Sequence, residues 1–169
     1  LGARMGVVSA SPIESYPRLG ADLLKWYDLC ARDLPWRRTQ DPYGIWISEI
    51  MLQQTRVDVV IERWLRFMER FPRVSELARA QEDEVLAEWA GLGYYRRARA
   101  IHAAARVIME QHDGVFPQTH KDVLDLPGIG PYTAGAITSI GFGQQEALVD
   151  GNVERVFARL FQLDEVTGS

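Results

Sequence analysis

The sequence has a single cysteine, Cys30, among its 169 residues. One cysteine excludes a disulfide within the chain and any metal site built from several cysteines. The only histidines are His102, His112 and His120, and they lack the spacing of metal ligands. We therefore predict no metal site in this chain and expect the three histidines to lie on helix surfaces.

Long apolar runs and an excess of positive charge are also missing. No apolar stretch reaches the length of a membrane span, and no signal-peptide pattern begins the chain, so we expect a cytoplasmic protein without membrane contact. The net charge of −4 counts against binding to nucleic acid, which depends on Lys and Arg. Charge is local, however, and arginines cluster in two places: Arg32, Arg37 and Arg38, and Arg96, Arg97 and Arg99.

Helical spacing of apolar residues runs through most of the chain, whereas two-residue alternation is rare. Apolar side chains from Val57 to Phe71, for example, form a wide stripe on one face of a helix. We predict an all-α fold with a flexible segment at 1–16 and one domain at 17–169. The predicted helices cover about 18–31, 42–54, 57–71, a short stretch after 75, 82–90, 95–112, 121–125, 131–140 and 151–161.

The most informative run is Leu-Pro-Gly-Ile-Gly-Pro-Tyr-Thr-Ala-Gly at 126–135. Gly128 and Gly130 can adopt positive φ and let the backbone approach a ligand closely. Pro131 suits the first turn of the helix that follows. Free N–H groups at such a turn and helix start form an anion site, so the run indicates a phosphate-binding hairpin. A helix joint that binds nothing is the alternative.

Two carboxylates are candidates for acid–base chemistry. Glu49, among apolar neighbours, lies either on an exposed helix face or in a desolvated pocket. In a pocket its pKa would rise and it could act as a general acid. Asp150 either caps the last helix or stays ionised to stabilise a positively charged sugar. Cleavage of an N-glycosidic bond needs both roles, and the sequence leaves the alternatives open.

Five runs in order resemble the endonuclease III superfamily of helix-hairpin-helix DNA glycosylases and, within it, the adenine DNA glycosylases (MutY family). The runs are Leu-Pro-Trp-Arg at 34–37, WISEIMLQQT at 46–55, GLGYY at 91–95, LPGIGPYTAGAI at 126–137 and VDGNVERV at 149–156. The resemblance spans about 34–163 and implies a helical bundle or barrel that acts in base excision repair. The implied reaction is hydrolytic removal of adenine mispaired with 8-oxoguanine or guanine in double-stranded DNA, after base flipping, by a monomer at the bacterial nucleoid.

The resemblance also assigns roles to individual residues. It implies that Glu49 protonates adenine at N7 and handles the water, and that Asp150 stabilises the oxocarbenium-like sugar. Bifunctional members have a lysine where this chain has Tyr132, and a phenol cannot form their Schiff base, so a monofunctional enzyme is expected. The implied DNA- and base-binding residues are Trp36, Arg37, Leu52, Gln54, Tyr94, Tyr95, Gly128 and Gly130.

This chain also departs from the family. Its members bind a 4Fe–4S cluster through four cysteines near the C-terminus and usually carry a further domain that reads 8-oxoguanine. Those cysteines are absent here, so we expect a fragment or truncated product of a longer glycosylase. Two alternatives stay open: a thymine or uracil mismatch glycosylase, which Tyr132 also fits, and a DNA-binding fragment without catalysis. Glu49 within Ser-Glu-Ile-Met-Leu-Gln-Gln-Thr favours adenine.

Overall fold

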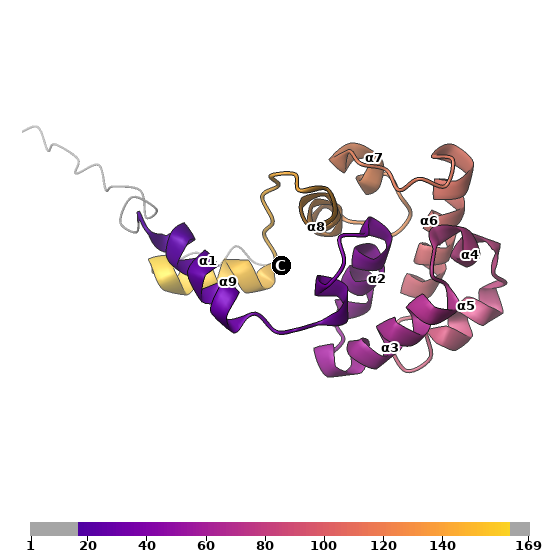
Figure 1. Cartoon of the computed structure of the whole chain (residues 1–169), viewed down its shortest axis with the longest axis horizontal. Coiled ribbons are helices and arrows are strands. Elements are labelled where there is room, and N and C mark those ends of the chain that lie inside the picture. The colour runs from indigo at the N-terminus through magenta and orange to yellow at the C-terminus, as the bar shows by residue number, and fades with distance from the viewer. Residues whose placement is uncertain (1–16, 163–169) are drawn as a thin grey trace, which may run out of the picture. The chain divides into compact units, whose positions relative to one another are not determined.

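The structure, a computed structural model, describes residues 17–162. This range is helical, with no strand in it (Figure 1). The predicted all-α fold is therefore confirmed, and the helices lie close to the predicted ranges. In chain order they are α1 (Leu19–Cys30), the 3-10 helix η1 (Pro35–Arg37), α2 (Pro42–Leu52), α3 (Val57–Arg70), α4 (Val74–Arg79), α5 (Glu82–Glu88), α6 (Arg96–Gln111), α7 (His120–Leu124), α8 (Pro131–Phe142) and α9 (Gly151–Phe161).

Two compact units divide the chain, one made of residues 33–150 and the other containing α1 and α9. The predicted flexible segment at 1–16 lies outside the described residues, so the domain boundary at residue 17 stays a prediction. Among the described helices, none is long and apolar enough to cross a lipid bilayer.

The core of the 33–150 unit is built around α2. Eight of its residues are buried, from Tyr43 to Met51, and they cover nearly every side of the helix. A helix that is apolar all round must be enclosed by its neighbours. Accordingly, α2 packs against α3 and against α8. Glu49 is the one ionisable carboxyl on this enclosed helix, which is why its surroundings matter.

The helices α1 and α9 differ from the rest in having no buried residue. Trp26 of α1 is 59% exposed and Val156 of α9 is 62% exposed. Within α9, the rings of Phe157 and Phe161 stack with their centroids 5.4 Å apart. Both helices therefore present apolar side chains that are largely exposed.

One histidine does not lie where the sequence pattern placed it. His102 is only 3% exposed, on the inward face of α6. Its Nε2 lies 3.0 Å from the backbone oxygen of Ala80, within hydrogen-bonding distance, and burial lowers its pKa. The predicted surface position was wrong for His102 because a single polar side chain can replace an apolar one on a packed helix face when a backbone group pairs with it.

Candidate active site

Glu49 is a half-buried carboxyl near the C-terminal end of α2. Burial raises its pKa, and the nearby negative charge of Asp150 raises it further. The side chain of Glu49 is therefore partly desolvated rather than fully exposed on the helix face, and its role as a general acid stays a prediction. A carboxyl that keeps its proton above the usual pKa of 4.5 is suited to donate that proton.

Tyr132 and Asp150 lie close enough to Glu49 to interact with it electrostatically. Tyr132, in the first turn of α8, is 41% exposed. Its pKa is raised by burial, then by the charge of Glu49 and then by that of Asp150. The structure thus brings together the three residues that the sequence singled out for catalysis, from α2, from α8 and from the segment that follows α8.

The end of α8 explains how Asp150 returns toward α2. Gly143 takes a left-handed conformation, with φ of 67°, and its N–H donates to the backbone oxygen of Ser139 at 3.0 Å. This glycine ends the helix and reverses the chain. The returning segment then packs on α8 at Gly135, where a Cβ atom would collide with the side chain of Leu148. A glycine at this contact therefore lets the segment that carries Asp150 lie against the helix.

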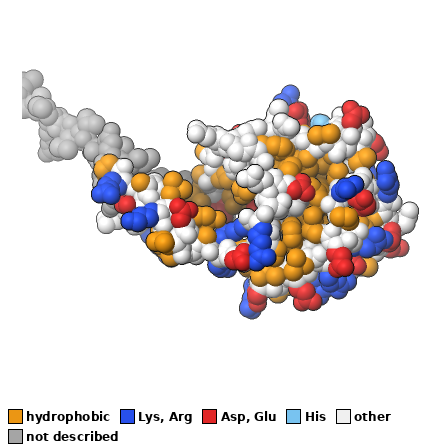
Figure 2. Space-filling view, viewed as in Figure 1, with side chains coloured by type: hydrophobic (Ala, Val, Ile, Leu, Met, Phe, Trp, Pro, Cys, Tyr) orange, Lys and Arg blue, Asp and Glu red, His pale blue; other side chains and the backbone are white. Residues whose placement is uncertain are grey.

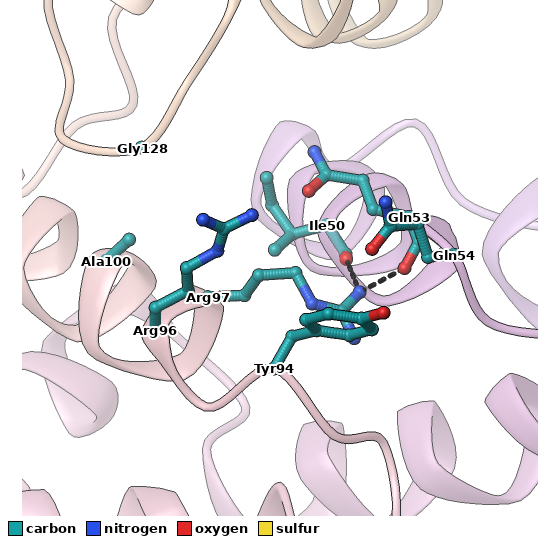
Figure 3. Close-up of a pocket in the computed structure, with 8 residues that line it drawn as sticks. All are labelled: Ile50, Gln53, Gln54, Tyr94, Arg96, Arg97, Ala100 and Gly128. Carbon is teal, nitrogen blue, oxygen red and sulfur yellow. Dashed lines mark hydrogen bonds between the residues drawn. The ribbon is translucent and has the colours of Figure 1, made fainter.

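A pocket of about 570 Å³ lies where the end of α2, the loop before α6 and the turn at Gly128 face one another (Figure 3). Its lining residues are Ile50, Gln53, Gln54, Tyr94, Arg96, Arg97, Ala100 and Gly128. Three of these, Gln54, Tyr94 and Gly128, are among the predicted DNA-binding residues. The two arginines belong to a cluster visible in the sequence, whereas nothing in the sequence marked the other three.

Two of the pocket residues hold strained backbone conformations. Gln54 has φ of 58° and Tyr94 has φ of 46°, in the left-handed region that residues other than glycine rarely adopt. Such strain is characteristic of functional sites, where the surrounding structure holds the residue in place. Both side chains are exposed, and Tyr94 is 56% exposed. They are therefore available to contact a ligand.

Arg97 ties together the segments that hold Gln54 and Tyr94. Its side chain is 8% exposed, and its guanidinium donates to the backbone oxygens of Ile50 at 2.7 Å and Gln53 at 2.5 Å. It donates also to the Leu92 oxygen, at 3.0 Å, in the loop before α6. Ile50 lies in the last turn of α2, where backbone oxygens have no partner within the helix. Arg97 supplies the missing donor there.

Aromatic rings complete the surroundings of Arg97. The guanidinium carbon lies 5.4 Å from the centre of the Trp89 ring and 5.6 Å from that of Tyr94. Rings at such distances attract a cation. Burial lowers the pKa of Arg97, and the charge of Arg96 lowers it too, but a guanidinium stays protonated in proteins. Arg97 is therefore a buried cation that joins α2, the loop before α6 and the Tyr94 ring.

The hairpin between α7 and α8 has one left-handed glycine rather than two. Gly128 has φ of 77°, whereas Gly130 has φ of −98° and is the residue before the first turn of α8. The expectation of positive φ was therefore wrong for Gly130. Pro131 begins α8 as predicted, and no side chain caps this helix start, so its first N–H groups are open to an anion.

We expect Gly128→Ala to destabilise the chain by about 1–3 kcal/mol, because positive φ disfavours a side chain and the contact is crowded. A Cβ atom at Gly128 would lie 2.5 Å from the Cβ of Ala100. Gly130→Ala is the matched control, since a Cβ there meets no atom within 4 Å. Urea denaturation of both variants measures the difference. Equal losses of stability would contradict this role of Gly128.

Besides Gly130, four predicted DNA-binding residues lie outside the pocket. Trp36 is 6% exposed and packs edge-on against Trp64, with ring centroids 6.1 Å apart, so it belongs to the core. Arg37 is exposed, and Leu52 is half-buried at the end of α2. Tyr95 is 41% exposed immediately before α6. Contacts of these four residues with DNA stay predictions.

The residues of this chain do not fit an iron–sulfur cluster. A 4Fe–4S cluster needs four cysteine thiolates, and the sequence has Cys30 alone, which is exposed. Within residues 17–162, moreover, no group of three or more His, Cys, Asp or Glu side chains is placed to hold a metal ion. A cluster would have to be held by residues outside this chain.

Curated proteins similar to this chain are adenine DNA glycosylases. The human protein of that name is 47% identical over 147 residues, which cover 82% of this chain and 27% of the human protein. The protein from Buchnera aphidicola subsp. Baizongia pistaciae is 43% identical over 143 residues, which cover 84% of this chain and 41% of that protein. The chain thus spans less than half the length of each.

Two solved structures of DNA-processing enzymes share the fold of this chain. A thermostable thymine-DNA glycosylase superposes with a TM-score of 0.81 at 30% identity, covering 88% of this chain and 69% of that one. A DNA-bound endonuclease III, at 22% identity, shares the fold with a TM-score of 0.80, covering 95% and 73% of the two chains. Residues 47–168 match the family model of the HhH-GPD superfamily base excision DNA repair proteins. Because this match covers more than half of the chain, it shows that the chain belongs to the HhH-GPD superfamily.

Proposed function

We propose that this chain carries the chemistry of an adenine DNA glycosylase, which hydrolyses the N-glycosidic bond of adenine mispaired with 8-oxoguanine or guanine. The observation that carries the proposal is the electrostatic interaction of Glu49, Tyr132 and Asp150 around one site. Two carboxyl groups in different environments are what this bond cleavage requires. The names of the relatives supply the substrate base.

The two carboxyl groups would act in sequence. Glu49 would donate a proton to N7 of adenine as the bond to C1′ of the sugar breaks, a role that its raised pKa favours. The carboxylate of Asp150 would oppose the positive charge that develops on the sugar. Glu49, now a carboxylate, then accepts a proton from the water that attacks C1′. Adenine and an abasic site are the products.

The residue at position 132 determines whether a glycosylase of this type can also cleave the DNA strand, and here it is Tyr132. A lysine amine at this position could attack C1′ and lead to strand cleavage through an imine, whereas a phenol cannot form one. Burial and the two carboxylates raise the pKa of Tyr132, so its hydroxyl stays neutral and can donate a hydrogen bond. We therefore propose a monofunctional glycosylase that leaves the DNA backbone intact.

The substrate would be double-stranded DNA from which the adenine is flipped. Gln54 and Tyr94, exposed at the pocket, would enter the duplex, and the turn at Gly128 with the start of α8 would bind a phosphate. We propose that the enzyme acts as a monomer. Its chromosomal substrate would place it at the nucleoid, in the cytoplasm of a bacterium.

We expect base release to decline as pH rises through the pKa of Glu49. The general acid must hold its proton, and a raised pKa moves the decline to a higher pH than an ordinary glutamate, with pKa 4.5, would give. Single-turnover rates across a pH series measure this. Glu49→Gln, which cannot titrate, should lose the decline together with most of the rate. A decline centred at or below 4.5 would contradict the proton-donor role.

A panel of duplexes tests the proposed substrate. Each contains one mispair: adenine with 8-oxoguanine, adenine with guanine, thymine with guanine, or uracil with guanine. We expect abasic sites at adenine alone. Abasic sites at thymine or uracil would instead identify a mismatch glycosylase like the thymine-DNA glycosylase that shares this fold. Duplex binding without any abasic product would identify a DNA-binding fragment.

A further inference from the structure

The start of α6 has an unusual charge distribution. Its first turn contains Arg96, Arg97 and Arg99, contains no acidic residue, and has no side-chain cap, since Tyr95 makes no capping hydrogen bond. The N-terminal end of a helix is the positive end of its dipole and favours negative charge. The sequence therefore concentrates positive charge where the helix itself is already positive, an arrangement that a bound anion would stabilise.

Two other arginines of the α3 to α6 region are paired with acids. Arg66 pairs with Glu88 at 3.0 Å, and Arg99 pairs with Glu82 at 2.8 Å. Figure 2 shows how positive and negative side chains alternate over the face that α3 to α6 form. Arg96, by contrast, makes no hydrogen bond or ion pair with any residue of the range 17–162. It is exposed, so a ligand can reach it.

Arg96 and Arg97 both line the pocket of about 570 Å³, and no acidic residue lines it. Arg97 is a buried cation whose Nε has no hydrogen-bond partner among the described residues. In Figure 3 the side chain of Arg96 extends from α6 on the side that faces the turn at Gly128. Although the chain has a net charge of −4, the side chains that line this pocket include two positive charges and no negative charge.

We propose that Arg96 and the first turn of α6 bind a backbone phosphate of duplex DNA, separate from the phosphate held by the turn at Gly128 and the start of α8. This inference rests on the proposed function. An arginine fork and the positive end of a helix dipole both favour phosphate oxygens. A DNA backbone supplies phosphates at regular intervals, so a duplex held at the first site brings another phosphate to the second.

The test uses duplexes in which one phosphate at a time is replaced by an uncharged methylphosphonate. Binding of the full chain, Arg96→Ala and Arg106→Ala is measured for each duplex. Arg106 is exposed on the same helix and does not line the pocket, so it is the matched control. We expect Arg96→Ala to bind the all-phosphate duplex about tenfold more weakly, whether or not it contains a mispair.

The positions of the neutral linkages identify the phosphate. At one linkage, neutralisation should weaken binding by the parent and by Arg106→Ala but should have no effect on Arg96→Ala. The slope of log affinity against log salt should also fall by about 0.9 for that variant alone. If every linkage affects Arg96→Ala as it affects the parent, the proposed phosphate site is wrong. If the parent binds no duplex, the proposed function fails instead.

Discussion

Asp150→Asn is expected to slow single-turnover release of adenine about a thousandfold, with little change in duplex affinity. Asparagine keeps the shape of the side chain and removes its charge. That charge acts only when the sugar becomes positive, so its loss should affect the chemical step rather than binding. Rates under single-turnover conditions and affinities for an uncleavable duplex separate the two effects.

Asp83→Asn is the matched control for Asp150→Asn, because Asp83 is exposed on α5, which contributes nothing to the site. It should keep the parental rate. A second readout is the titration of Glu49, followed by its carboxyl carbon signal in NMR. Asp150 raises the pKa of Glu49, so Asp150→Asn should lower it. An unchanged rate, or an unchanged pKa of Glu49, would contradict the pairing of these two carboxyls.

Arg97→Ala is expected to lower the free energy of unfolding by about 3 kcal/mol or more. The substitution leaves the backbone oxygens of Ile50 and Leu92, both buried residues, without the donor that serves them. Arg97→Lys should recover only part of the loss, since an ammonium group cannot reproduce the fork of a guanidinium. Urea denaturation of both variants measures these differences.

Arg99→Ala provides the comparison on the same helix. Arg99 is exposed and pairs with Glu82 at 2.8 Å, and exposed ion pairs contribute about 0–1 kcal/mol. Arg97→Ala should also weaken duplex binding, because Gln54 and Tyr94 would lose the contacts that hold their strained backbones. If Arg97→Ala is as stable as Arg99→Ala, Arg97 does not join these segments.

The helices were predictable, because local spacing of apolar residues determines them. The surroundings of Glu49 were not. Its pKa depends on Asp150, which follows it by about a hundred residues and reaches the site only because Gly143 ends α8 and Gly135 accepts the returning segment. Contacts between distant segments leave no periodic signal in a sequence, so the surroundings of Glu49 could not be predicted from it.

Arg97 and His102 show the same limit for polar residues. On a helix, such side chains are usually solvated, so the arginine cluster indicates a surface. Both are buried here because backbone oxygens of other segments, Gln53 for Arg97 and Ala80 for His102, are turned toward them. The partner is a backbone group that every residue possesses, and no residue type marks it in the sequence.

Base release from a duplex with one adenine opposite 8-oxoguanine tests the central claim most directly. The 169-residue chain is incubated under single-turnover conditions, and the products are divided between a lane treated with alkali and an untreated lane. We expect free adenine, with strand breaks only after alkali, since Glu49 and Asp150 remove the base and Tyr132 cannot cleave the backbone. Breaks without alkali, or no release of adenine, would contradict it.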